Sequence, residues 1–200
     1  MFVIGITGSL STGKSTVASM LAHKAKGINL NADQIARRSL SKNGKSFSGV
    51  VKLFGKGILS AGSIDRKKLA KIVFVDPKKL KALEKIVHPV VDQEIRAVLK
   101  AANKTNSVIV LDVPLLFEAK LDKVCDLVVV VTAKVNEQIK RSGKNLGLSE
   151  LEAKNRIAAQ MPLMEKIRRA DVQIDNNKTL NQLRVQVEKL WKKIQPELSV

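Results

Sequence analysis

Residues 8–15 have the spacing of a phosphate-binding loop. They read Gly-Ser-Leu-Ser-Thr-Gly-Lys-Ser, which matches G-x-x-x-x-G-K-[ST] at every fixed position, directly after a strand-like run and before a helical pattern. Gly8 and Gly13 let the backbone wrap a phosphate with its amide hydrogens turned inward, and the following helix adds its positive end. Lys14 can reach the β- and γ-phosphates of a nucleoside triphosphate, and the Ser15 hydroxyl can hold Mg²⁺. The loop alone leaves kinases, GTPases, helicases and transport ATPases open.

Two carboxylates follow apolar runs and could serve the same chemistry. Asp112 ends the run at 108–111, so it would emerge at the carboxyl edge of a buried strand, where doubly wound sheets bind ligands. There it could hold magnesium directly or through water, and a strand-ending turn is the competing interpretation. Asp33 follows the run at 28–30; if that strand neighbours the first one, the carboxylate could take the proton of an attacking hydroxyl. The competing interpretation is that Asp33 caps a helix beginning at Gln34.

A sheet must bring these residues to one edge, and the apolar runs predict one. Short runs rich in Val and Ile alternate with longer amphipathic stretches, which is typical of an α/β protein with a parallel sheet. Strands are expected at 2–6, 108–111 and 127–131, with weaker candidates at 28–30 and 172–174. Helices are expected after Lys14, in pieces over 67–99, and over 180–194. The pairs Asp76-Pro77 and His88-Pro89 are expected to break the middle stretch, because a residue before proline avoids the helical region.

The segment between the second and third expected strands is far longer than one crossover helix requires. We therefore expect residues 34–104 to form a helical insertion that covers the carboxyl edge of the sheet. Residues 136–165 are polar and basic and would form a second excursion, with Gly143 and Gly147 as hinges. The nucleotide-binding core would then comprise residues 1–33, 105–135 and 166–200.

Composition narrows the class of protein further. Of the 200 residues, 44% are hydrophobic and 27% charged, which argues against both a disordered and a membrane-spanning chain. The single Cys125 excludes an intramolecular disulfide and a Cys-based zinc cluster, and it fits a reducing compartment, so we expect a cytoplasmic location. A net charge of +18 would attract polyanions, although many of these side chains can simply solvate a helix face. With 3% aromatic residues and no Tyr, platforms for stacking bases are scarce.

The sequence closely resembles the dephospho-coenzyme A kinase family, nearly end to end. Beyond the loop block at 5–16, the matching blocks are Ala-Asp-Gln-Ile-Ala-Arg at 32–37, Ser-Ile-Asp-Arg-Lys-Lys-Leu at 63–69, Val-His-Pro at 87–89, Val-Pro-Leu-Leu-Phe-Glu at 113–118, Arg-Ile-Ala-Ala-Gln-Met at 156–161, and Ile-Asp-Asn-Asn at 174–177. Among proteins with this loop, the Pro-Leu-Leu-Phe-Glu and Ile-Asp-Asn-Asn segments are specific to that family.

The resemblance implies a fold and a reaction. The fold is a three-layer α/β/α arrangement with a five-stranded parallel sheet, like that of nucleoside monophosphate kinases. Residues 34–104 would bind dephospho-coenzyme A, and 136–165 would act as a lid. With Mg²⁺, ATP would phosphorylate the ribose 3′-hydroxyl of dephospho-coenzyme A to give coenzyme A and ADP, with no obligatory nucleic acid and no membrane. A kinase for another nucleoside or nucleotide, a basic nucleic-acid-binding NTPase and a homologue that binds coenzyme A without turnover are the alternatives.

The resemblance also implies roles for individual residues. Asp33 would be the general base, Lys14 would clamp the γ-phosphate, and Arg141 would be a lid arginine near the phosphates or the adenine. Arg37 and His88 would contact the acceptor, although His88 could merely cap a helix end. Leu115 and Leu116 would wall the acceptor cleft or belong to the core. The expected nucleotide-binding residues are Gly8, Ser11, Thr12, Gly13, Lys14, Ser15, Thr16, Arg141 and Asn177, and the expected metal ligands are Ser15 and Asp112.

Some positions depart from the usual family pattern. Ser9 and Ser11 stand where it has glycine, and Lys144 stands where an arginine is common in the lid. Asn31 stands where an aspartate is usual, and an amide cannot accept a proton as a carboxylate can. Asp33 is the carboxylate that remains there, so it is the expected base.

Overall fold

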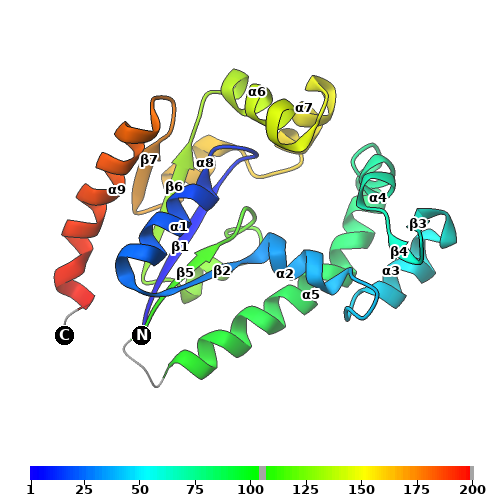
Figure 1. Cartoon of the computed structure of the whole chain (residues 1–200), viewed down its shortest axis with the longest axis horizontal. Helices are drawn as coiled ribbons and strands as arrows, with labels where there is room; N and C mark the ends of the chain where they lie inside the picture. Colours follow the sequence, from blue (N-terminus) through cyan, green and yellow to red (C-terminus); the bar gives the residue numbers. More distant parts are fainter. Residues whose placement is uncertain (104–106, 199–200) are drawn as a thin grey trace. The chain divides into compact units, whose positions relative to one another are not determined.

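The phosphate loop leaves the central strand of a parallel sheet. The structure is a computed structural model that describes residues 1–103 and 107–198. Within these residues the main sheet has five strands in the order β2-β5-β1-β6-β7, all parallel (Figure 1). Their bounds are β1 Phe2–Gly8, β2 Ile28–Asn31, β5 Val108–Asp112, β6 Leu127–Thr132 and β7 Val172–Asp175. All the strands expected from the sequence are thus confirmed, each with its carboxyl end slightly further along the chain.

The two faces of the sheet are covered by different segments. On one face, α1 (Lys14–Ala25) and α9 (Leu180–Ile194) pack their buried side chains on alternate residues of the strands, among them Ile4, Ile6 and Val110. On the other face, α8 (Leu163–Arg169) contacts β1 and β6, and Leu116 and Cys125 lie against Gly5. Covering on both faces explains why the central strands are apolar at consecutive positions. The arrangement confirms the three-layer α/β/α expectation.

Contact density divides the chain into two compact units, Met1–Asn31 with Leu99–Val200, and Ala32–Val98. The second unit contains α2 (Ala32–Ser39), α3 (Phe47–Phe54), the short helix η1 (Lys56–Ile58), the two-stranded hairpin of β3 (Leu59–Ser60) and β4 (Ser63–Ile64), α4 (Arg66–Val73) and most of α5 (Pro77–Ala102). Its own core includes Ile35, Val50, Ile58 and Leu69. The expected boundary between residues 104 and 105 lies outside the described residues, as do the last two residues of the chain.

One of the two predicted proline breaks is present and the other is wrong. Asp76 separates α4 from α5 and accepts hydrogen bonds from the amides of Lys78 (2.9 Å) and Lys79 (3.3 Å). By contrast, α5 continues through Pro89. An interior proline costs roughly 3 kcal/mol. Burial of Val87, Val91 and Ile95 along one face of α5 offsets this, since each such side chain contributes about 1.5–3 kcal/mol.

Residues 136–165 belong to the same compact unit as the sheet. They lie in α6 (Val135–Leu146), α7 (Glu150–Ala158) and the start of α8. Gly147 ends α6 with φ 64°, a left-handed conformation that favours glycine, whereas Gly143 lies inside that helix. Ser149 and Glu152 form a capping box at the start of α7. None of the described helices is both long and apolar enough to cross a membrane.

Candidate active site at the phosphate loop

The loop between β1 and α1 has a backbone that two glycines make possible. A side chain at Gly8 would place its Cβ 2.4 Å from the carbonyl oxygen of Val131. At Gly13, where φ is 95°, a Cβ would lie 2.2 Å from Nδ2 of Asn176. Gly13 is also the N-cap of α1, and no side chain in the described part of the chain caps that helix start. The amide of Thr16 donates to the carbonyl oxygen of Gly13 at 3.1 Å, and those of Lys14 and Ser15 are available to an anion.

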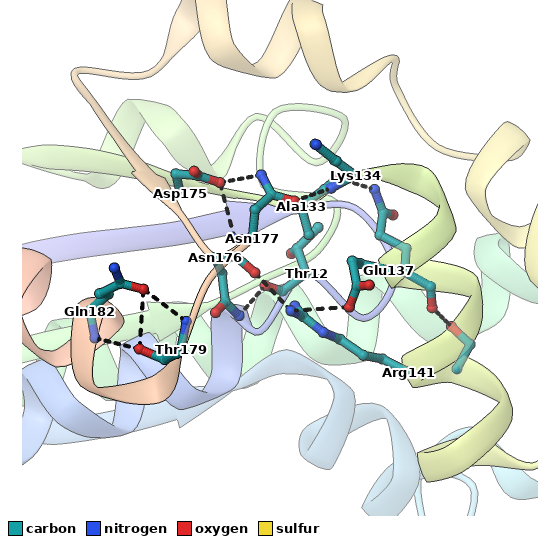
Figure 2. A network of polar contacts seen from close by, with 12 residues as sticks. Thr12, Ala133, Lys134, Glu137, Arg141, Asp175, Asn176, Asn177, Thr179 and Gln182 are labelled. Atoms are coloured by element: carbon teal, nitrogen blue, oxygen red, sulfur yellow. Dashed lines mark hydrogen bonds and ion pairs between the residues drawn. The ribbon is translucent and has the colours of Figure 1, made fainter.

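The loop is held by hydrogen bonds from two other elements. The Nδ2 group of Asn176, directly after β7, donates to the carbonyl oxygen of Thr12 at 2.8 Å (Figure 2). The Thr12 hydroxyl in turn donates to the carbonyl of Ser9 at 3.1 Å. On the other side, the hydroxyls of Ser11 and of Ser142 in α6 are hydrogen-bonded at 2.9 Å. The loop shape is thus fixed before any ligand arrives.

Ser11 occupies a left-handed conformation with φ 53°. A serine in that region is strained, which explains why glycine is usual at this position in the family pattern. The hydrogen bond to Ser142 opposes the strain, and it joins the loop to α6. The departure from the pattern therefore adds a hydrogen bond that a glycine side chain could not make.

Arg141 lies beside the loop, as Figure 2 shows. Its Nη2 donates to the backbone oxygen of Asn176 at 2.8 Å, and the same group lies 3.7 Å from Glu137. Its Nη1 is buried and has no hydrogen-bond partner among the described residues. Since Asn176 contacts both Arg141 and Thr12, the arginine and the loop share one anchor. A guanidinium placed there can offset the charge of bound phosphates.

The carboxyl ends of β1, β5 and β2 bring Asp112 next to the loop strand. Asp112 is opposite Ile6 in β1 and opposite Asn31 in β2, and its exposed fraction is 1%. Asn31 donates from Nδ2 to Oδ2 of Asp112. The supposition that the second strand neighbours the first is wrong, because β5 lies between them. Of the two carboxylates predicted to serve the chemistry, Asp112 is therefore the one on a strand paired with the loop strand, and Asn31 orients it.

The residues expected to bind or deprotonate the acceptor belong to the second unit. Helix α2 begins at Ala32, so Asp33 lies in its first turn and does not cap a helix that starts at Gln34. Asp33 and Arg37 are both exposed and stand one turn apart on α2. His88 is exposed within α5, inside the helix rather than at its end.

The remaining expected residues differ in accessibility. Ser15 and Thr16 are exposed at the start of α1, and Lys14 is buried. Leu116 is fully buried against Gly5, which is a core position, whereas Leu115 is half-buried. The side chain of Asn177 accepts from the amide of Lys134 at 2.7 Å and donates to Asp175. Its neighbour Asn176 is the residue that contacts the loop, and the sequence offered no means to choose between two adjacent asparagines.

A family model described as dephospho-CoA kinase matches residues 2–182, which include the loop, both carboxylates and the asparagine pair. The chain belongs to the dephospho-CoA kinase family. The dephospho-CoA kinase of Symbiobacterium thermophilum is 44% identical over 194 residues, covering 96% of this chain and 81% of that one. The one from Arabidopsis thaliana is 42% identical over 202 residues, covering 100% and 86%.

Solved structures agree with this family assignment. The dephospho-CoA kinase from Campylobacter jejuni has a TM-score of 0.68 with 27% identity over 96% of each chain. The Thermus thermophilus protein TT1252 has a TM-score of 0.75 with 32% identity, over 96% of this chain and 97% of that one. Shikimate kinase from Acinetobacter baumannii, at TM-score 0.54 and 15% identity over 98% of this chain and 94% of that one, shares the fold. The chain is therefore a kinase of this family, and a nucleic-acid-binding NTPase is not favoured.

Proposed function

We propose that the chain transfers the γ-phosphoryl group of ATP to the ribose 3′-hydroxyl of dephospho-coenzyme A, giving coenzyme A and ADP. The observation that carries the proposal is the preformed phosphate loop, whose two glycines each lie where a Cβ would collide with Val131 or Asn176, in a chain matched to the family over residues 2–182.

On the donor side, the loop amides and the start of α1 would bind the phosphates of ATP. Lys14 would contact the β- and γ-phosphates, since it is the first residue of α1. Arg141 would offset the charge that spreads over the transferred group, because its planar guanidinium matches two phosphate oxygens at once. Its buried Nη1 has no partner among the described residues, so it is available for such a contact.

Ser15 and Asp112 fit a magnesium ion. Both offer oxygen, the donor that Mg²⁺ prefers, and Asp112 ends the strand paired with β1. Among the described residues no group of three or more His, Cys, Asp or Glu could hold a metal on its own. Mg²⁺ in kinases does not need such a group, because one or two side chains bind it together with phosphates and water. When bound, the ion would neutralise charge on the β- and γ-phosphates.

On the acceptor side, Asp33 would be the general base. Its carboxylate would take the proton of the 3′-hydroxyl as that oxygen forms a bond to the γ-phosphorus and the bond to the β-phosphate oxygen breaks, releasing ADP. It is an exposed acid two positions after Asn31, which ends β2 beside Asp112. Arg37, one turn further on α2, and His88 would bind the phosphates of the acceptor.

The proposal is tested by Asp33→Asn, which keeps the size of the side chain and removes the base. We expect turnover to fall by about 10²–10⁴-fold, the usual contribution of a general base, with ATP affinity unchanged within about threefold. Asp92→Asn is the matched control, because Asp92 is another acid of the same unit, half-buried, and pairs with Arg96 at 2.7 Å. Calorimetric titration with ATP and an assay of coenzyme A formation give the two readouts. Normal turnover in Asp33→Asn would assign the base to another group.

A further inference from the structure

The most deeply buried charge in the described part of the chain is not one of the residues that bind ATP. The side chain of Lys166 in α8 has an exposed fraction of 0%. Its Nζ donates to the carbonyl oxygen of Pro114 at 2.5 Å and lies 3.0 Å from Oε1 and 3.4 Å from Oε2 of Glu118. Burial lowers the pKa of the Lys166 ammonium, and the adjacent Glu118 carboxylate opposes this by raising the pKa. The net effect is a lowered pKa, and the Glu118 carboxylate is the neighbour that favours the charged form.

These partners are the two ends of one short segment. Pro114 and Glu118 bound residues 114–118, which begin two positions after Asp112. The Pro114 carbonyl also accepts from the buried hydroxyl of Thr7 at 3.1 Å, and Oε1 of Glu118 accepts from the amide of Met161 at 2.9 Å. The Lys166 ammonium thus binds the segment at both of its ends, Pro114 and Glu118.

The two leucines inside this segment differ in burial. Leu116 is fully buried against Gly5 of β1 and fixes the middle of the segment to the sheet. Leu115 is half-buried, and its carbonyl accepts from the amide of Ala119 at 2.9 Å. The contacts of Lys166 are among those that fix the path of the segment, and hence the place of Leu115 beyond the end of β5.

A fully buried ammonium such as that of Lys166 is a poor way to gain stability, because its desolvation cancels much of its attraction to the partly exposed Glu118 carboxylate. The Lys166 ammonium also lies close enough to Lys14 for that second cation to disfavour its charge. Two cations near each other repel unless a carboxylate neutralises one of them. Glu118 neutralises Lys166, so Lys14 remains the cation available to a phosphate.

We propose that Lys166 is a positioning residue for the kinase reaction. It fixes residues 114–118 through Pro114 and Glu118, and this segment shapes the binding of the acceptor rather than of ATP. The inference rests on the proposed function, because it takes the acceptor to be dephospho-coenzyme A and takes Leu115 to wall the acceptor cleft, as the family resemblance implies.

The decisive variant is the double substitution Lys166→Met/Glu118→Leu. It removes both charges, so neither is left without its partner, and it replaces the pair with apolar side chains of similar size. We expect the thermal midpoint to stay within a few degrees of that of the parent chain and the ATP dissociation constant to stay within about threefold, while KM for dephospho-coenzyme A rises about tenfold or more. Lys166→Met alone leaves the Glu118 carboxylate without this partner, and we expect it to be less stable than the double variant.

The matched control is Lys24→Met/Glu188→Leu, which removes a Lys–Glu pair that joins α1 to α9 at the surface. We expect both KM values of this control to be unchanged. An unchanged KM for dephospho-coenzyme A in a folded Lys166→Met/Glu118→Leu variant would overturn the inference, as would an equal loss of affinity for ATP. If that variant does not fold, Glu118→Gln is the test instead, because it retains the hydrogen bond between Lys166 and Pro114. A rise of at least twofold in KM for the acceptor would support the positioning role, and an unchanged KM would refute it. Failure of the parent chain to phosphorylate dephospho-coenzyme A at all would instead refute the proposed function.

Discussion

Asn176 anchors both the phosphate loop and Arg141, and its replacement by alanine tests how the loop is preformed. Asn176→Ala removes the donor that binds the Thr12 carbonyl at 2.8 Å but leaves the backbone oxygen that binds Arg141. Only the contact to the loop is lost. We expect the variant to fold with a less stable loop.

The magnitude follows from the burial of Thr12, whose exposed fraction is 0%. A buried carbonyl that loses its donor costs about 1–3 kcal/mol. For a chain of this length each kcal/mol lowers the thermal midpoint by about 2–4 °C, so we expect a decrease of roughly 2–12 °C. If the whole cost falls on the loop conformation, the ATP dissociation constant rises by about 5–150-fold.

The assay is thermal unfolding with and without Mg-ATP, together with calorimetric titration of ATP. Asn177→Ala is the matched control, because its side chain bonds to Lys134 and Asp175 rather than to the loop. We expect the control to lose stability while its affinity for ATP stays within about threefold. Equal loss of ATP affinity in both variants would refute the assignment of Asn176 as the anchor, and so would an Asn176→Ala variant with unchanged stability and affinity.

Two further predictions concern Cys125 and the region 136–165. Burial raises the pKa of the Cys125 thiol to about 12, above its ordinary value of 9.0, so the unfolded chain loses this proton first. Stability should therefore fall as pH rises above 9, by at most about 1.4 kcal/mol per pH unit from this group, and urea unfolding of Cys125→Ala should lack that part of the slope. We propose that residues 136–165 close over bound substrates, with Gly147 as the hinge that ends α6. Amide exchange in α6 and α7 should slow when ATP and acceptor are both present, and unchanged exchange would refute closure.

The strands of the sheet could be predicted well because each is marked by the apolar residues that compose it. Runs of Val and Ile such as those of β5 and β6 are buried on both faces, so their identity does not depend on distant residues. The phosphate loop is equally local, since Gly8 and Gly13 are required by the path of the backbone. These features could be predicted without knowing the fold.

The structural features that could not be predicted from the sequence depend on contacts between residues that are distant along the chain. The place of β5 between β1 and β2 is set by tertiary packing, and it makes Asn31 the partner of Asp112. Lys166 stands in a helix among other basic residues, where a lysine normally faces solvent, and only the fold reveals Pro114 and Glu118 around it. A family pattern that pairs a lysine at 166 with an acid at 118 could have identified this contact.

The path of α5 through Pro89 was missed for a related reason. The proline rule describes local backbone preference, whereas the burial of Val87, Val91 and Ile95 along one face outweighs it. Local sequence rules failed where several tertiary contacts acted together.

The central claim is that this chain phosphorylates a ribose hydroxyl of dephospho-coenzyme A, and phosphorus NMR of the reaction products tests it most directly. Purified protein with Mg-ATP and dephospho-coenzyme A should give ADP and a 3′-phosphomonoester in equal amounts, while adenosine, cytidine and single-stranded DNA should give no phosphorylated product. ADP release stimulated by DNA alone, or a phosphomonoester formed on another acceptor but not on dephospho-coenzyme A, would contradict the account.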